Sequence, residues 1–158
     1  MFGFKKKVPQ KSSKFEVLAP ASGRLIDLGE VKDEVFSSRM MGEGFAIVPE
    51  NGKIYAPVSG SAVSVFPTGH AVGLHTPTGV DVLIHIGLDT VSLNGEGFKV
   101  KVAQGDEVQA GDLLVEFDPQ VLKAHELDST TMVIFTDGFP SKIQVSPKMV
   151  NKGDRLIG

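Results

Sequence analysis

The chain has 158 residues, no cysteine and four histidines, and its formal charge is −3. A domain of this length buries a large hydrophobic core, and the lack of cysteine excludes disulfides, thiolate metal sites and a thiol nucleophile, which favours a reducing, cytoplasmic compartment. No apolar run approaches the ~18 residues that a membrane-spanning helix needs, so we expect one soluble domain.

Residues 1–14 differ from the rest of the chain in charge. They contain five lysines and no acidic residue, which leaves 11 basic and 19 acidic side chains in residues 15–158. We interpret residues 1–14 as a flexible basic N-terminal arm and residues 15–158 as the domain. Weak contact of the arm with an anionic membrane surface, which would make the protein peripheral at the inner face, is the alternative to a solvated terminus. An acidic body without a basic face argues against nucleic-acid binding.

From Phe15 onward, short apolar runs alternate with Gly, Pro, Asn and Ser. Turn signals recur about every 8–12 residues, which is typical of an all-β, antiparallel sandwich or barrel; one or two short helices complete the expected fold. Residues 31–48 are less regular. Their larger apolar side chains can pack in a core or line a binding face, and the sequence favours the core; they are Val35, Phe36, Met40 and Met41.

Residues 68–91 hold three of the four histidines and have the pattern of two apolar strands around a turn. Pro77 presets the first central position of the turn, and Gly79 can adopt a positive φ. If the hairpin is symmetric, facing residue numbers add to 155, as 70 + 85 do. His70 and His85 are then neighbours across the ladder, about 5 Å apart at Cβ.

A second register is open for this hairpin. Proline at the first turn position excludes the primed turns, and a type I turn with a bulge at Gly79 shifts the pairing by one residue. Ala71 then lies opposite His85, and a further irregularity, at Gly69 or Gly73, is needed to bring the two histidines together.

Helical periodicity is scarce, and residues 118–127 are the clearest candidate for a helix. Asp118 is a suitable N-cap, proline occupies the first helical position, and Val121, Leu122 and His125 are spaced for one face. We expect His125 to be solvated or half-buried in the last turn.

Two internal repeats indicate a fold built by duplication. Ala19-Pro-Ala-Ser-Gly23 recurs as Ala56-Pro-Val-Ser-Gly60, and residues 105–114 match residues 147–156, with Gly-Asp pairs at corresponding positions. Two copies of each cannot stack into a solenoid, so we interpret them as matching corners of a pseudo-symmetric sandwich or barrel.

Paired histidines support several kinds of chemistry near neutral pH. His70 and His85 can be structural, metal ligands, a general acid and base, or a nucleophile with a helper. No third ligand has a suitable spacing nearby, so no metal is expected. The last interpretation needs only two rings and an open face: one imidazole nitrogen attacks phosphorus, and the other ring donates a hydrogen bond to the phosphoryl oxygens. The chain has no nucleotide-binding loop motif, and no cofactor is expected.

Several blocks, in order, carry a family resemblance. They are Ala19-Pro-Ala-Ser-Gly23, Met40-Met-Gly-Glu-Gly-Phe-Ala-Ile47, Ala56-Pro-Val-Ser-Gly60, Thr68-Gly-His-Ala71, Leu83-Ile-His-Ile-Gly-Leu-Asp-Thr-Val91 and Leu93-Asn-Gly-Glu-Gly-Phe98. From about Phe15 to its end, the chain resembles the enzyme IIA component of the glucose family of the bacterial phosphoenolpyruvate:sugar phosphotransferase system. The resemblance implies a β-sandwich phosphotransferase that accepts phosphate from the histidine-containing phosphocarrier protein. It also implies transfer of the phosphate to a cysteine on the IIB domain of a sugar permease, which drives sugar uptake and phosphorylation.

The resemblance also implies roles for individual residues. His85 matches the phosphorylated histidine, His70 its companion, and Thr68 a hydroxyl in the same network. Gly87 and Asp89 match residues close behind the two rings. The residues that match partner-binding positions are the acids Asp33 and Asp89, which would meet arginines of the donor, and the apolar residues Val35, Phe36 and Val91. His75 has no role in the family pattern, and we expect it to be a strand residue near the turn.

Two other families have similar corners. Biotinyl and lipoyl carriers resemble residues 105–112, but they need a lysine at a hairpin tip, and Lys148 lies in the wrong half-repeat. A non-catalytic carrier of this type is the alternative function. Zinc peptidases on a related duplicated fold would have histidine motifs that this chain lacks.

Overall fold

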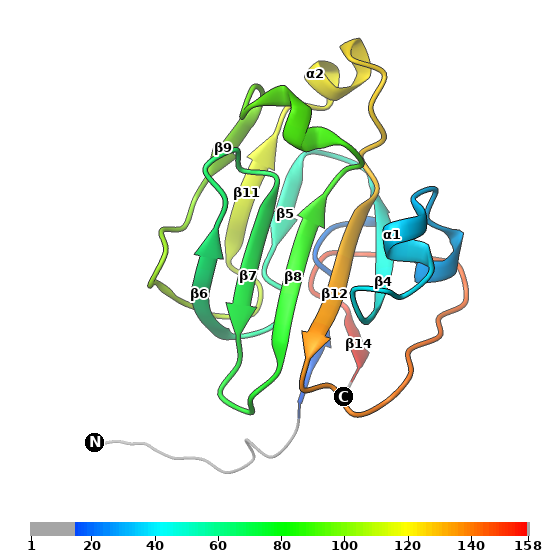
Figure 1. Cartoon of the computed structure of the whole chain (residues 1–158), viewed down its shortest axis with the longest axis vertical. Helices are drawn as coiled ribbons and strands as arrows, with labels where there is room; N and C mark the ends of the chain where they lie inside the picture. Colours follow the sequence, from blue (N-terminus) through cyan, green and yellow to red (C-terminus); the bar gives the residue numbers. More distant parts are fainter. Residues whose placement is uncertain (1–14, 158) are drawn as a thin grey trace.

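A computed structural model describes residues 15–157 of the chain, and the arm expected at residues 1–14 lies outside them. The described residues form a mostly antiparallel β-sandwich (Figure 1), which confirms the predicted fold class. The largest sheet has the order β10 (Glu107–Val108), β6 (Gly60–Val65), β7 (Ala71–His75), β8 (Asp81–Ile86), β12 (Thr131–Asp137), β4 (Glu43–Pro49), β3 (Gly23–Asp27), β13 (Lys148–Val150). Two smaller sheets are β5 (Lys53–Tyr55), β11 (Leu113–Phe117), β9 (Phe98–Val100), and β14 (Arg155–Ile157) with β2 (Val17–Leu18).

Helical segments are short in the described part of the chain. They are η2 (Leu28–Glu30), α1 (Glu34–Ser37), η3 (Thr90–Leu93) and α2 (Pro119–Ala124). The predicted helix at residues 118–127 is confirmed as α2, where the Asp118 carboxylate accepts a hydrogen bond from the amide of Gln120 and His125 is an exposed C-cap. Within residues 15–157, no helix has the length and hydropathy that crossing a membrane requires.

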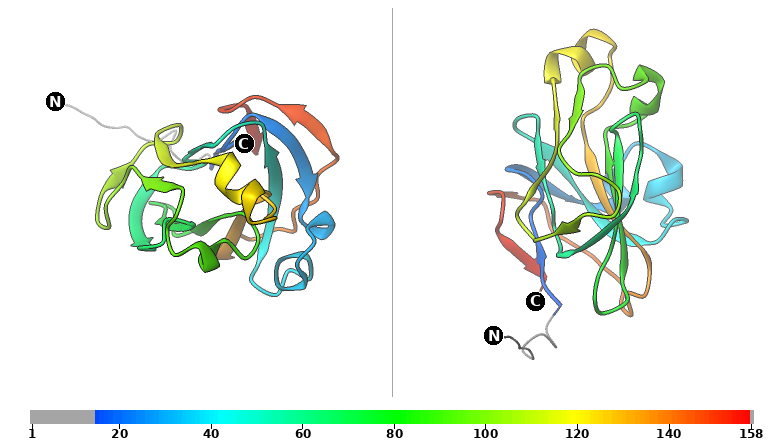
Figure 2. Two further views of the ribbon diagram at one scale, coloured as in Figure 1. Left: turned by 90° about the horizontal axis from the view of Figure 1, so that it is seen from above. Right: turned by 90° about the vertical axis from the view of Figure 1, so that its left-hand side faces the viewer.

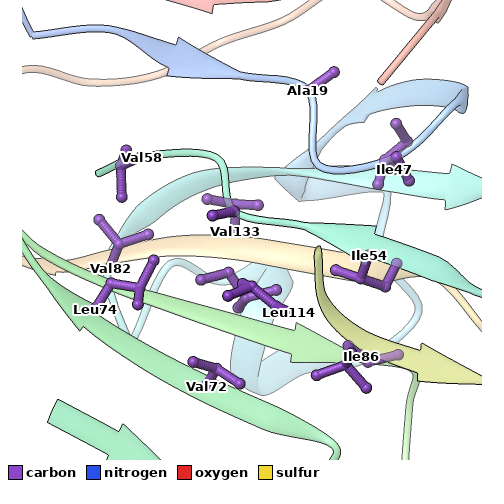
Figure 3. Close-up of a cluster of buried hydrophobic side chains, with 14 of the residues drawn as sticks. Ala19, Ile47, Ile54, Val58, Val72, Leu74, Val82, Ile86, Leu114 and Val133 are labelled. Carbon is purple, nitrogen blue, oxygen red and sulfur yellow. The ribbon is translucent and has the colours of Figure 1, made fainter. Parts of the chain in front are cut away.

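The main core lies between the large sheet and the smaller sheets (Figure 3). Strand β8 contributes Val82, Ile84 and Ile86, each at most 1% exposed, from one face. Side chains at alternate positions of a strand point to opposite faces, so Leu83 and His85 point to the other face of the sheet. The alternation that buries β8 therefore also presents His85 away from the main core.

A second, smaller hydrophobic cluster covers that other face. Phe36 of α1 packs there with Leu28 and with Met132 and Ile134 of β12. In the right-hand view of Figure 2, α1 lies on one side of β8 and β12, and β2 and β14 lie on the other. The part of residues 31–48 that precedes β4, α1 included, therefore packs apolar side chains on the face of the sheet that carries His85.

The four apolar side chains of residues 31–48 divide between core and surface. Phe36 is buried and Met41 packs partly against the second cluster, as expected of core residues. The prediction of a core position is wrong for Val35 and Met40, which are 46% and 75% exposed. The difference arises because only one face of this short helix and of the loop after it packs on the sheet, so the side chains on the other face are exposed.

The two repeats form matched corners, as predicted. The amide of Ala19 donates to the carbonyl of Asp154, and that of Ala56 donates to the carbonyl of Asp112. The reverse bonds also correspond, from Gly153 to Ala19 and from Gly111 to Ala56. The serine hydroxyls also have equivalent roles: that of Ser22 accepts from the amide of Lys152, and that of Ser59 accepts from the amide of Ala110.

Candidate functional site

His85 is the penultimate residue of β8, and the arrow of β8 points toward the end of the molecule where α2 lies (Figure 1). Across the ladder it pairs with Met132, which is fully buried, and its ring lies 4.9 Å from the ring of Phe36 between centroids. The imidazole is thus held between an apolar strand neighbour and an aromatic ring, and it is only partly accessible to solvent.

The hairpin of β7 and β8 has the shifted register. Ala71 lies opposite His85, so pairs add to 156, and the symmetric register is wrong. The reason is the turn: Gly79 has φ +89° and its amide donates to the carbonyl of Thr76, so Gly79 is the bulge residue that shifts the register by one.

A turn at Gly69 restores the histidine pair. Gly69 has φ +75°, and its amide donates to the carbonyl of Phe66, so the chain reverses immediately before His70. The His70 carbonyl accepts from the amide of Ile86, which fixes the end of β7 against β8. The two imidazole centroids are 5.1 Å apart, with the ring planes at 79°. The second irregularity that the shifted register requires is therefore present.

Each ring has its Nδ1 atom engaged within the chain. Nδ1 of His85 lies 3.0 Å from the carbonyl oxygen of Gly87, and because a carbonyl only accepts, the ring nitrogen carries the proton. Nε2 of His85 is then the nitrogen with the free lone pair. Nδ1 of His70 lies 2.5 Å from Oγ1 of Thr68, and a hydroxyl that donates to Nδ1 leaves a proton on Nε2 of His70.

Burial lowers the pKa of both histidines. Desolvation is the main cause for His85, whose pKa falls from 6.5 to about 4, and the neighbouring His70 lowers it further. The Gly87 carbonyl and the carboxylates of Asp33 and Asp89 act in the opposite direction. His70 is 5% exposed, and desolvation lowers its pKa too. At neutral pH the site therefore holds two uncharged imidazoles.

Two acidic side chains approach the histidines from different loops. Asp33 is the N-cap of α1, where its carboxylate accepts from the amide of Val35. Asp89 is exposed and has φ +59°, and its carboxylate makes no capping hydrogen bond at the start of η3. Asparagine and aspartate tolerate this left-handed conformation better than most residues. The Asp89 carboxylate is thus exposed and is not occupied by capping η3.

Two aromatic side chains contact the histidine pair, and one of them was not predicted. Val35 and Val91 are 46% and 53% exposed, whereas Phe36 is 6% exposed and supports the His85 ring. Phe66 is 40% exposed, and its ring centroid lies 5.4 Å from that of His70. The signal for Phe66 was present in the sequence, because it immediately precedes the Pro-Thr-Gly turn that leads into His70.

The remaining histidines lie elsewhere. His75 is a residue of β7 beside the turn, as expected, and its Nδ1 lies 2.5 Å from a carboxylate oxygen of Asp81. Nε2 of His125 lies 3.5 Å from a carboxylate oxygen of Glu96. Among residues 15–157, no cluster of three or more histidine, aspartate and glutamate side chains has the geometry of a metal site.

Comparison with known protein families shows which family the chain belongs to. Residues 15–139 match the model of the phosphoenolpyruvate-dependent sugar phosphotransferase system, EIIA 1. The chain belongs to this family. The EIIA assignment carries a phosphotransferase role within the sugar phosphotransferase system, and it excludes the biotinyl or lipoyl carrier.

Individual relatives agree with the EIIA assignment. A glucose-specific EIIA component of Halalkalibacterium halodurans is 45% identical over 140 residues, which are 87% of this chain and 81% of that protein. The glucosamine-specific EIICBA component of Bacillus subtilis is 51% identical over 118 residues, 75% of this chain and 19% of that protein. The solved structure of glucose permease IIA from Mycoplasma capricolum has a TM-score of 0.82, with 46% identity, and covers 90% of this chain and 93% of that one.

Several of the relatives are much longer than this chain. It spans 19% of the glucosamine-specific component and 17% of the glucose-specific EIICBA component of Streptococcus pneumoniae, to which it is 52% identical over 123 residues. The aligned EIIA region is therefore one part of those larger proteins.

Proposed function

We propose that His85 carries the phosphoryl group between the histidine-containing phosphocarrier protein and the IIB domain of a sugar permease. The observation that carries the proposal is the convergence of the His70 and His85 rings, 5.1 Å apart, with both Nδ1 atoms occupied from within the chain. This arrangement leaves one Nε2 lone pair as the nucleophile and one Nε2 proton beside it.

The phosphoryl transfer needs no group that accepts a proton. Nε2 of His85 attacks the phosphorus of the donor's phosphohistidine, so a new N–P bond forms while the donor's N–P bond breaks and its imidazole leaves. His85 keeps its Nδ1 proton, and the positive charge that develops on the ring is stabilised by the Gly87 carbonyl, 3.0 Å away. In the second step a IIB thiolate attacks the phosphorus, and His85 returns to its neutral form.

His70 and Thr68 supply charge stabilisation to this transfer. Phosphoryl transfer depends mainly on positioning and on hydrogen bonds to the equatorial oxygens. A His70 ring that accepts from the Thr68 hydroxyl at Nδ1 carries its proton on Nε2, and its centroid lies 5.1 Å from that of the ring that would hold the phosphoryl group. The low pKa of His85 keeps it uncharged and nucleophilic at neutral pH.

The surface around the pair suits two successive protein partners. Val35, Val91 and Phe66 are exposed apolar residues that can exclude water from the transfer. Asp33 and Asp89 add negative charge for arginine side chains of the donor, and electrostatic complementarity of this kind raises association rates. Phe36 is predicted to act with them chiefly by holding the His85 ring, since it is buried.

The transfer requires a compartment in which donor and permease domain are both accessible, and we place it in the cytoplasm. The names of the relatives include glucose and glucosamine, and the sugar that this chain serves would be chosen by the permease. Membrane contact through residues 1–14 stays a separate prediction.

The test is phosphorylation in vitro. The chain is incubated with phosphoenolpyruvate, the general phosphotransferase enzyme and the phosphocarrier protein, and an acid-labile phosphate is sought by mass spectrometry of the intact protein. We expect one phosphate on the wild type, none on H85A, and a normal amount on the control H75A, whose histidine is exposed and distant in the ladder. Full labelling of H85A would refute the proposal.

A further inference from the structure

The carbonyl of Gly87 supports the ring of His85, and the contacts of Gly87 indicate how this carbonyl is held. The Gly87 carbonyl is the acceptor for Nδ1 of His85, so the orientation of this residue decides which ring nitrogen carries the proton. Gly87 has φ +79°, a left-handed conformation that glycine adopts without strain. A flexible glycine would let its carbonyl turn away unless other groups fix it.

Thr90 is placed to provide that restraint. It is fully buried at the first position of η3, and its hydroxyl donates to the carbonyl of Ile86, 2.5 Å away. The amide of Gly87 donates to the carbonyl of Thr130, 2.9 Å away. Both polar ends of the Ile86–Gly87 peptide therefore have a partner, one of which is the Thr90 side chain. The next peptide, which carries the Gly87 carbonyl, is held by its Leu88 amide, which donates to the carbonyl of Asp128.

The methyl group of Thr90 restrains the same residue from another direction. A Cβ atom on Gly87 would overlap this methyl group and come within 2.9 Å of the carbonyl oxygen of Asp128. The space where a side chain would lie is thus already filled by Thr90. Threonine offers both a hydroxyl for the carbonyl and a methyl for the glycine, which serine or valine alone would not.

We infer that Thr90 is a positioning residue: it fixes the Ile86–Gly87 peptide and fills the space beside Gly87, and so keeps Gly87 where its carbonyl accepts from Nδ1 of His85 and the Nε2 lone pair stays available. Thr90 does not touch the phosphoryl group. The inference rests on the proposed function for its effect on transfer, but the tautomer of His85 is a property of the protein alone.

The experiment therefore has two readouts. The tautomer is measured from the ¹⁵N chemical shifts of the His85 ring in the unphosphorylated chain, and transfer is measured as the rate of phosphate gain from the phosphocarrier protein. The variants are T90V, which keeps the methyl and loses the hydroxyl, and T90S, which keeps the hydroxyl. T76V is the matched control, because Thr76 is also buried and bonded to backbone, at the opposite end of the hairpin.

We expect T90V to lose the single Nδ1-protonated form in favour of a mixture and to gain phosphate about tenfold more slowly, the order of effect of one lost hydrogen bond. T90S should retain most of the tautomer preference, and T76V should match the wild type in both readouts. An unchanged tautomer in T90V overturns the inference, as does an equal change in T76V. If T90V does not fold, T90S decides: loss of the tautomer preference there refutes the role of the hydroxyl.

The two proposals fail separately. A wild-type chain that shows the Nδ1-protonated tautomer yet gains no phosphate on His85 refutes the proposed function and leaves the positioning role of Thr90 intact. A chain that is phosphorylated on His85, but whose tautomer is indifferent to T90V, refutes the positioning role alone.

Discussion

The rings of His70 and His85 converge to 5.1 Å although the two residues are not partners in the strand ladder. His85 belongs to a strand in the middle of a sheet, whereas His70 stands just outside the end of β7, where the turn at Gly69 directs it. The proposed nucleophile is thus on the rigid element, and its companion is placed by a turn.

This arrangement predicts separate effects for the two histidines. In H70Q, the His85 lone pair remains, so phosphate should still be gained from the donor. Transfer onward to a IIB domain should slow by a hundredfold or so, on the order of what loss of one preorganised donor to a developing charge costs. The measurement is sugar phosphorylation in a reconstituted system, and normal turnover by H70Q would contradict the helper role.

The depressed pKa of His85 predicts acid-sensitive stability. An unfolded chain protonates histidine near pH 6.5, whereas folded His85 stays neutral to about pH 4, so the unfolded state binds more protons between these values. Stability from this source is present above pH 6.5 and falls as the pH falls, by about 2 kcal/mol between pH 7 and pH 5. Urea unfolding at the two pH values should show a smaller loss for H85Q than for the wild type. Equal losses would count against a depressed pKa.

Asp89 should contribute to capture of the donor. Asparagine also tolerates the left-handed backbone at this position, so D89N should fold normally while losing the charge. We expect slower association with the phosphocarrier protein and a weaker dependence of that rate on salt. Stopped-flow measurements at several ionic strengths test this; an unaltered salt dependence would remove Asp89 from the docking charge.

Phe66 is predicted to be an energetic contact for partners. Its ring packs against His70 and is 40% exposed, as expected of an anchor at an interface centre. F66A should weaken partner binding by about 1–2 kcal/mol, measured by calorimetry. The control is M149A, which removes a side chain that is 64% exposed on β13, at the edge of the same sheet. Equal weakening by both variants would argue for a nonspecific effect.

Arg39 should stabilise the loop that carries Asp33 and Phe36 to the site. Its guanidinium lies 3.1 Å from carboxylate oxygens of Asp27 and Glu43 and donates to the carbonyl of Ile143. R39A removes the cation from two part-buried carboxylates, which keep only hydrogen bonds from the amides of Gly29, Val145 and Ile143, and we expect a loss of about 1–3 kcal/mol in the free energy of unfolding. The exposed pair of Arg155 and Glu16 is the control, and R155A should have little effect. Similar losses would show that the network adds nothing.

Local sequence signals predicted the elements of the site better than they predicted the strand register and the contacts between those elements. The turn residues Pro77 and Gly79 identified the hairpin, and the repeated Gly-Asp pairs identified the matching corners. The register remained open because it depends on whether the turn carries a bulge, which Pro77 and Gly79 permit without requiring. The contact of Phe66 with His70 depends on the chain reversal at Gly69, and the exposure of Met40 depends on which face of residues 31–48 meets the sheet. These are tertiary outcomes that no local pattern contains.

The duplicated corners have a consequence for how the protein can change. They hold each other mainly through main-chain atoms, and none of the residues assigned to phosphoryl transfer lies in them. Architecture and reactivity are therefore encoded in separate stretches of sequence. The side chains at the corners can therefore change, by evolution or by design, while the sequence of the hairpin that carries the histidines stays the same.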